Sequence, residues 1–442
     1  NIVHAIGRFR FAISTDPISK LKLGESFSDV AALPTAKRTP QQKKRLRRLF
    51  LSTYAPPKIK DPYMHLQKLQ AEIKRLQTQS ISTMVMQDMP NPRKTHLLFR
   101  GKYDKKREEV TAGTPAFLPS MPNEAPMNRL GLARWMVSKK HPLTARVAVN
   151  REWQRLFGIG IVKTTEEFGA QGDWPSHPKL LDWLAVHFMN SGWDTKALLK
   201  FIVTSATYRQ SSSATPELLV RDQANLLLAR GPRHRLDAEI VRDNALAVSG
   251  LLVEKIGGPS VFPYHPKGLW QELNNRPNYS RTYKQDKGEK LYRRSLYTYW
   301  KRTVPPPSMA TFDAPEREFC LVRRSRTNTP LQAFVMLHDP QFVEAARHLA
   351  ERMMSASDNP DGCIEHGFRL ATSRLPNNKE KVVLHRLFRE RLLFYRKDKK
   401  AANAVLSVGE SIRNVNLSES EQAAWTTVAR ALLNLSETIS KN

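Results

Sequence analysis

The fold of this chain is indicated most clearly by the stretch Thr329-Pro-Leu-Gln-Ala-Phe-Val-Met-Leu-His-Asp-Pro-Gln-Phe-Val343. Thr329 can cap a helix, Pro330 suits the first helical position, and Gln332 completes a capping box. Asp339 and Pro340 repeat the start signal ten residues later. The stretch therefore predicts two consecutive helices, and the apolar residues that follow each start are expected to face a core.

Similar start signals recur from Asn128 onward. Asn128, Ser176 and Asp194 each precede an apolar helical pattern that they can cap. A further helix is expected within residues 236–255, ended by Gly257-Gly258-Pro259. Residues 259–327 are rich in Pro, Tyr and Arg and predict long ordered loops. We expect residues 125–440 to form one mainly helical domain, with no sheet of four or more strands.

The residues before this domain predict three smaller segments. Residues 1–15 mix β-forming residues with partial alternation and predict the last strand of an upstream β-rich domain in a longer precursor. Residues 16–80 predict a linker and a basic helical hairpin, and residues 81–124 a connector with short strands at 83–86 and 95–99. The hairpin helices are expected to start at Thr39-Pro40 and Asp61-Pro62. Apolar residues of the second helix have the spacing of a short coiled coil: Leu66, Leu69, Ile73 and Leu76.

The chain is strongly basic. Its 442 residues include 71 Lys and Arg against 41 Asp and Glu, a formal charge of +30. The excess is denser near the beginning, since residues 1–130 hold 24 basic and 10 acidic side chains. Such a charge favours encounters with polyanions, so nucleic acid, anionic lipid and sulfated or carboxylated polysaccharide are candidate partners. The alternative is a solvated basic surface that keeps the chain soluble.

Familiar signatures of catalysis and cofactor binding are missing from the sequence. It contains no Gly-rich phosphate loop, no H-E-x-x-H, no G-x-S-x-G and no zinc-type spacing of His and Cys. Its two cysteines, Cys320 and Cys363, lie outside any C-x-x-C or C-x-x-C-H pattern, which excludes haem attachment within this segment. No apolar run is long enough to span a bilayer. We therefore expect no cofactor, no metal and no membrane span in this segment.

Two polar clusters could carry chemistry. In the first, Asp173 and His177 lie close together in a glycine-rich turn before a helix, where they could act as an acid/base pair or satisfy backbone groups of an ordered loop. In the second, arginines precede the helix start at Thr329 and could bind a carboxylate, sulfate or phosphate. Asp313, Glu316 and Glu318 could instead neutralise those arginines. The candidate ligand-binding residues are Arg323, Arg324, Arg326 and Asn328, and Asp313 is a third candidate acid/base group.

Several long motifs resemble those of one family. They include Asn128-Arg-Leu-Gly-Leu-Ala-Arg-Trp135, His141-Pro-Leu-Thr-Ala-Arg-Val-Ala-Val-Asn-Arg151, Ser176-His-Pro-Lys-Leu-Leu-Asp-Trp-Leu-Ala185, Ser205-Ala-Thr-Tyr-Arg-Gln210, Thr303-Val-Pro-Pro-Pro-Ser308, Phe312-Asp-Ala-Pro315 and Arg323-Arg-Ser-Arg-Thr-Asn-Thr-Pro-Leu-Gln332. With these motifs the chain is similar to a planctomycete-specific domain of unknown function that ends many large secreted proteins, and the resemblance covers about residues 125–440.

The resemblance implies an extracytoplasmic location and certain companions. In that family the domain often follows an exported leader, a c-type cytochrome domain and other upstream domains of the same precursor. It implies no catalytic residues. The first hypothesis is thus an accessory or binding module of an exported, cytochrome-linked protein that handles anionic polysaccharide. The second is an enzyme acting on such a polymer, and the third, nucleic-acid binding, rests on charge alone because no recognised motif supports it.

Overall fold

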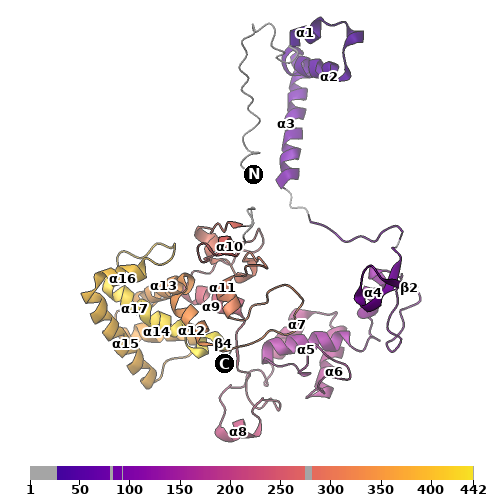
Figure 1. Cartoon of the computed structure of the whole chain (residues 1–442). Coiled ribbons are helices and arrows are strands. Elements are labelled where there is room, and N and C mark those ends of the chain that lie inside the picture. Colours follow the sequence, from indigo (N-terminus) through magenta and orange to yellow (C-terminus); the bar gives the residue numbers. More distant parts are fainter. Residues whose placement is uncertain (1–26, 80–82, 92, 274–280, 442) are drawn as a thin grey trace. The chain divides into compact units, whose positions relative to one another are not determined.

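The computed structural model of the chain describes residues 27–79, 83–91, 93–273 and 281–441 (Figure 1). The strand predicted at residues 1–15 lies outside the described residues. Two compact units make up the chain, residues 1–110 and 111–442. Helices dominate both units, and the strands are few and short, so the prediction of a mainly helical fold is confirmed.

The first unit starts with helices that follow one another closely. They are α1 (Phe27–Ala32), the short η3 (Thr35–Lys37), α2 (Pro40–Leu49), a π-helical turn η4 (Phe50–Tyr54) and α3 (Pro57–Gln79). The start of α2 is as predicted, since Thr39 N–H donates to Gln42 Oε1 at 2.8 Å and Gln42 N–H donates to Thr39 Oγ1 at 3.2 Å. The first residue of α3 is Pro57, five residues before the predicted Pro62, because Pro57 occupies the first turn and Pro62 is accommodated inside the helix.

A small hairpin completes the first unit. Strands β1 (Thr95–Leu98) and β2 (Lys106–Val110) are antiparallel, with His96 opposite Glu109, and the turn η5 (Phe99–Gly101) lies between them. The strand expected at 95–99 is thereby confirmed. The one expected at residues 83–86 is wrong: in the described chain these residues pair with no strand, and Met84 is 99% exposed.

The second unit opens with five helices: α4 (Arg129–Met136), α5 (Thr144–Phe157), α6 (Pro178–Asn190), α7 (Thr195–Thr204) and α8 (Pro216–Arg221). Asn128 and Asp194 cap α4 and α7 as predicted. At α6 the cap position belongs to His177 instead of Ser176, because Ser176 Oγ donates to Ile161 O at 3.3 Å. Helices α5, α6 and α7 enclose a core that includes Val149, Trp153, Leu181, Leu184, Phe188, Leu198 and Ile202.

Short elements connect this part to the remaining helices. After β3 (His234–Arg235), α9 (Ala238–Ser249) ends at Gly250 with a left-handed φ of +81°, not at the predicted Gly257-Gly258. The described residues between 259 and 327 form mostly irregular chain, as predicted. The short helices among them are α10 (Leu269–Glu272), η7 (Gly288–Tyr292), η8 (Ser295–Tyr297) and α11 (Pro307–Thr311).

A second core is built around α13. Helices α12 (Pro330–His338) and α13 (Pro340–Ala356) begin where the sequence predicts. Packed beside them are α14 (Pro360–Thr372), α15 (Asn378–Lys397), α16 (Lys399–Leu406) and α17 (Glu419–Leu433) (Figure 1). After α18 (Ser436–Ile439), β4 (Ser440–Lys441) pairs with β3 and brings Lys441 opposite His234. Fully buried residues of this core include Ala345, Leu349, Met353, Ile364, Val428 and Leu432.

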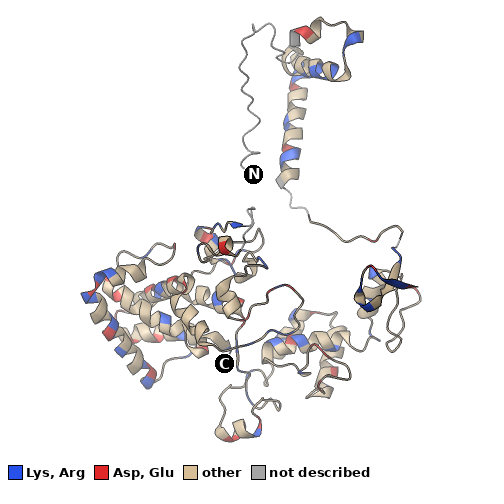
Figure 2. Ribbon diagram, in the orientation of Figure 1, with Lys and Arg blue, Asp and Glu red and all other residues tan. Residues whose placement is uncertain are grey.

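Charged residues are spread over both units. Figure 2 shows basic residues on α2 and residues of both charges on α3 and α15. Among the described helices, none is long and apolar enough to cross a membrane.

Candidate functional site

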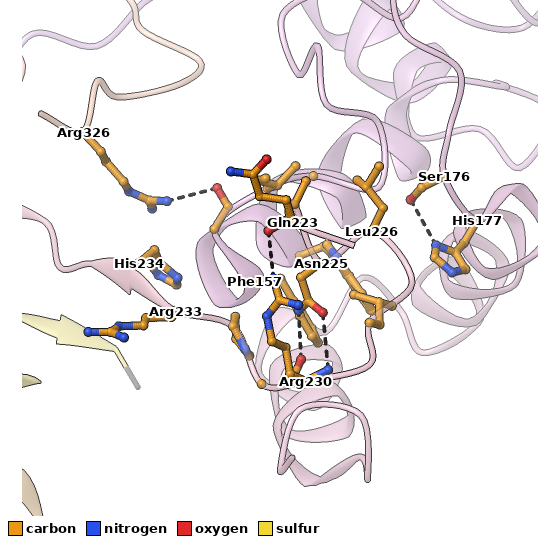
Figure 3. A pocket seen from close by; sticks show the side chains of 18 residues that line it. Phe157, Ser176, His177, Gln223, Asn225, Leu226, Arg230, Arg233, His234 and Arg326 are labelled. Carbon is orange, nitrogen blue, oxygen red and sulfur yellow. Dashed lines mark hydrogen bonds between the residues drawn. The ribbon is translucent and has the colours of Figure 1, made fainter. Parts of the chain in front are cut away.

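A pocket of about 330 Å³ lies at the end of α5, where it meets the segment that leads into β3 (Figure 3). We call it the first pocket. Gly158 ends α5 with φ +83°, a conformation that glycine adopts readily. A Cβ at this position would meet the His234 ring at 3.0 Å. Glycine therefore allows the helix end and His234 to approach closely enough to form one wall.

The lining of the first pocket is basic. Its charged and titratable side chains are those of Arg230, Arg233, Arg326, His177 and His234, and none of the residues that line it is Asp or Glu. In Figure 3, Arg233, His234 and Arg326 lie on one side and His177 on the other. The buried rings of Trp153 and Phe157, stacked at 4.1 Å between centroids, also line it. Such a lining suits a negatively charged group beside an apolar surface.

Arg230 builds the wall of the first pocket. Its Nη1 donates to Asp222 O at 2.9 Å and its Nη2 to Gln223 O at 2.8 Å. The Asp222 carboxylate in turn accepts the N–H groups of Leu226 and Leu227, each at 2.8 Å. These bonds fix residues 222–230 as an ordered loop. Because its guanidinium is committed to backbone carbonyls, Arg230 serves as a structural residue.

Arg326 and Arg233 are more accessible. Arg326 Nη1 donates to Gly158 O at 3.0 Å, and no other hydrogen bond of its guanidinium is found among the described residues. Partial burial lowers the pKa of Arg326, the Asp237 carboxylate partly opposes that effect, and the nearby Arg324 lowers the pKa further. Arg233 is exposed at the rim. Both guanidinium groups keep N–H donors that could bind an anion.

His234 is the most perturbed titratable group of the first pocket. Burial lowers its pKa to about 4, and the charges of Arg326 and Lys441 add to the effect. Its Nδ1 atom is buried and has no hydrogen-bond partner among the described residues. The imidazole is therefore neutral at neutral pH. The two cations beside the ring, Arg326 and Lys441, favour a ligand that carries negative charge.

A second pocket, of about 510 Å³, adjoins the first and shares Gly158 and Arg326 with it. Arg323 and Arg324 line this second pocket, together with Arg155 and one carboxylate, Asp237. The predicted arginines thus belong to one loop, residues 321–327, which we call the arginine loop. Its Arg326 takes part in both pockets. Asn328 is exposed and lines neither.

The arginines pair with partners that the sequence does not suggest. Arg323 bonds to Glu166 at 3.2 Å, and Arg324 makes two bonds to Glu239, at 2.6 and 3.2 Å. The expected pairing with Asp313, Glu316 and Glu318 is not found among the described ion pairs. Left-handed backbone at Asp313 and Arg317, with φ of 60° and 64°, turns the chain between the acidic residues and the arginines.

Asp313 belongs to a structural network. Its carboxylate pairs with Arg235 and accepts the Thr327 N–H at 2.8 Å and the Thr327 hydroxyl at 2.9 Å. Arg235 also donates to Thr327 O at 3.0 Å. The network ties β3 to the end of the arginine loop. Asp313 lines neither pocket, so the role of its carboxylate is to hold β3 and the arginine loop together.

The three candidate acid/base groups do not meet. His177 lines the first pocket, where its Nδ1 bonds to Ser176 Oγ at 3.0 Å. Asp173 lines a third pocket, of about 360 Å³, together with Arg146 and Asp182, which pair at 2.7 Å. Asp313 is held by Arg235. The structure therefore brings His177 and Arg326 to one pocket but separates both from Asp173 and Asp313.

Sequence reasoning missed Arg233, His234 and the contribution of Lys441. A signal was present in the run Gly231-Pro-Arg-His-Arg235, where three basic residues follow a rigid dipeptide. Their link to Arg326, more than ninety positions later, could not be read from spacing. Both cysteines are free, Cys320 exposed and Cys363 buried. Within the described residues, no three His, Cys, Asp or Glu side chains gather as they would around a metal ion.

Comparisons with known proteins bear on the part of the chain that holds these pockets. Neither the curated proteins nor the solved structures include a match. A family model described as PSD1, protein of unknown function (DUF1553), matches residues 128–388, which is more than half of the chain and includes α5, the arginine loop and α13. The chain therefore belongs to the PSD1 (DUF1553) family of proteins of unknown function.

Proposed function

We propose that this chain is a non-catalytic binding module and that its first pocket holds an anionic group of a sulfated or carboxylated polysaccharide. The observation that carries the proposal is the lining of that pocket. Arg233, His234 and Arg326 face it, and none of its lining residues carries a carboxylate. Arg323 and Arg324 of the arginine loop are paired with Glu166 and Glu239. The first pocket has no carboxylate to pair with its cations, which favours an external anion.

The chemistry of the pocket supports an anionic sugar over an isolated ion. Guanidinium groups make directed, paired hydrogen bonds to carboxylate and sulfate oxygens. The rings of Trp153 and Phe157 add apolar surface beside the cations. The second pocket continues from Arg326 toward Arg323 and Arg324. A polymer with a charge on successive units could therefore contact both pockets at once.

The positions of the candidate acid/base groups support binding over catalysis. Most glycoside hydrolases use two carboxyl groups on either side of one substrate bond. The first pocket offers His177 but no carboxylate, since Asp173 lines the third pocket and Asp313 is paired with Arg235. Among the described residues, no recognised nucleic-acid motif accompanies the basic charge, so polysaccharide remains the favoured polyanion.

We also propose that the module works outside the cytoplasm, beside upstream domains of the same precursor that include a c-type cytochrome domain. This part of the proposal rests on the resemblance of the motifs between Asn128 and Gln332 to domains of large secreted proteins. Anionic polysaccharides are abundant at cell surfaces, so the location and the basic pocket agree with each other.

Retention on a sulfated matrix tests the proposal with charge-matched variants. The double variant Arg233→Ala/Arg326→Ala removes two positive charges from the first pocket. Its control, Arg386→Ala/Arg389→Ala, removes two exposed charges from α15. Counterion release makes retention of any basic protein fall with salt, so only the comparison of the two variants isolates the pocket.

We expect the pocket variant to elute at clearly lower salt than the α15 variant. The slope of log K against log salt concentration should also be smaller for the pocket variant, by roughly 1 to 2. Equal elution of the two variants would mean that retention follows net charge alone, and the proposed binding site would be wrong. Circular dichroism and thermal unfolding of both variants check that each is folded.

A further inference from the structure

Helix α3 of the first unit carries an apolar seam that is open to solvent. Leu66, Leu69 and Ile73 are 48%, 43% and 54% exposed. Exposed helix faces ordinarily carry polar side chains. The turn η4 packs against the start of α3, where Lys60 Nζ donates to Thr53 O at 3.4 Å. That contact leaves the seam accessible.

The seam has the repeat of a two-stranded coiled coil. Ile59, Leu66 and Ile73 follow one another at intervals of seven residues, and Leu69 and Leu76 occupy the second core position of the same repeat. Isoleucine at the first core position with leucine at the second, as at Ile73 and Leu76, favours parallel pairs of helices. Pro62 occupies the second core position of the first repeat, so two repeats have both core positions filled by Leu or Ile. The geometry of the seam therefore matches a partner with the same repeat.

The charges of α3 are arranged to permit such pairing. In a parallel coiled coil, the positions beside the core face the partner helix and decide whether it is attracted or repelled. Between residues 63 and 77 these positions carry no Lys or Arg, although the chain as a whole is strongly basic. They hold Tyr63, His65, Gln70, Glu72 and Gln77, whereas Lys68, Lys74 and Arg75 occupy outer positions.

We propose that α3 joins two copies of this chain in a parallel coiled-coil dimer. A second copy presents the same seam and the same flanks, whose only charged side chain between residues 63 and 77 is Glu72, so two identical helices can pair in a closed, two-fold arrangement. A strongly basic partner of another kind would need several acidic flanking residues, whereas α3 has one, Glu72. Because the seam is short, the dimer is weak, and the fraction of chains in the dimer rises with protein concentration.

Sedimentation equilibrium of the full chain from about 1 μM to about 1 mM tests this proposal, because a weak interface changes occupancy over that range. The average mass should rise from 50.5 kDa toward twice that value. Leu69→Lys places a charge in the core of both helices and should hold the mass at 50.5 kDa throughout. The control Ala71→Lys adds the same charge at an exposed outer position and should associate like the unaltered chain.

Cysteine cross-linking tests the orientation. In a Cys320→Ser background, which removes the exposed native thiol, Ile73→Cys places the same core position of two parallel helices face to face. It should give a disulfide-linked dimer, and Ala71→Cys should not. A mass of one chain at every concentration, association of the Leu69→Lys variant, or equal cross-linking at positions 71 and 73 would each overturn the proposal. None of these readouts depends on the first pocket.

Discussion

At the scale of single residues, Asp313 illustrates how one carboxylate can organise a site without lining it. Its carboxylate pairs with Arg235 and accepts hydrogen bonds from the N–H and the hydroxyl of Thr327. Arg235 is mostly buried, with 9% of its side chain exposed. Because a buried cation without a counter-charge is costly, Asp313 stabilises Arg235 and the end of the arginine loop, which carries Arg326.

Replacing Asp313 by Asn should lower the free energy of unfolding by about 3 kcal/mol, because Arg235 would lose its charged partner. Asparagine tolerates the left-handed backbone at this position, so the change isolates the charge from the conformation. Chemical denaturation measures the loss. Asp173→Asn, at an exposed carboxylate, is the control and should change stability by less than about 0.5 kcal/mol. Equal effects at the two positions would contradict the structural role of Asp313.

The residues of the candidate site were only partly predictable. Arg326 could be found because several arginines precede a clear helix start, and local patterns of this kind are visible in sequence. The partners of the arginine loop could not be predicted, because packing of distant segments brings Gly158 O to Arg326 and Glu239 to Arg324. For the same reason the sequence did not indicate that Asp173 and His177, only four positions apart, would line different pockets.

At the scale of elements, the end of α5 positions the wall of the first pocket. Gly158→Ala should lower stability by about 1 to 2 kcal/mol, since alanine disfavours φ +83° and its Cβ would press on His234. The matched control is Gly192→Ala, where φ is +74° and no atom lies within 4 Å of the added Cβ. That control should cost about 1 kcal/mol, the backbone contribution alone.

Binding to a sulfated matrix separates the two glycine variants further. The Gly158 variant should lose retention because His234 and the pocket wall are displaced, whereas the Gly192 variant should keep it. If both variants lose stability equally and both keep full retention, the close contact between Gly158 and His234 has no part in the site.

The elements themselves followed from the sequence where the signals are local. Caps at Thr39, Asn128 and Asp194 lie within one helical turn of the groups they bond, so residue type and spacing suffice to predict them. Errors arose where tertiary structure decides. Gly250, not Gly257, ends α9, although a glycine pair is the stronger sequence signal. Residues 83–86 have β-forming composition, but a strand requires a partner that local composition does not reveal.

At the scale of the whole molecule, the charge of +30 and the basic first pocket have different consequences. Net charge speeds encounter with any polyanion and is screened by salt. A pocket with fixed guanidinium groups selects the group that fits. The two effects are separable because charges on α15 contribute to the first but not the second. The account thus predicts general attraction over the surface and specific binding at one place.

The titration of His234 tests this central claim most directly, because it reports from inside the first pocket. Without ligand, burial and the neighbouring Arg326 and Lys441 hold the pKa of His234 at about 4. A bound anion would stabilise the protonated imidazole and raise the pKa of His234 above about 4, so proton uptake should accompany binding as pH falls through that raised pKa toward about 4. Affinity should accordingly rise as the pH is lowered.

The measurement is the NMR titration of the imidazole resonances with and without a fully sulfated oligosaccharide, with His234→Gln to assign the signal. The account predicts that the pKa of His234 increases by at least one unit when the oligosaccharide is bound, and that the resonance is absent from the variant. An oligosaccharide that binds the chain while the pKa of His234 stays near 4 would place the ligand elsewhere and contradict the account.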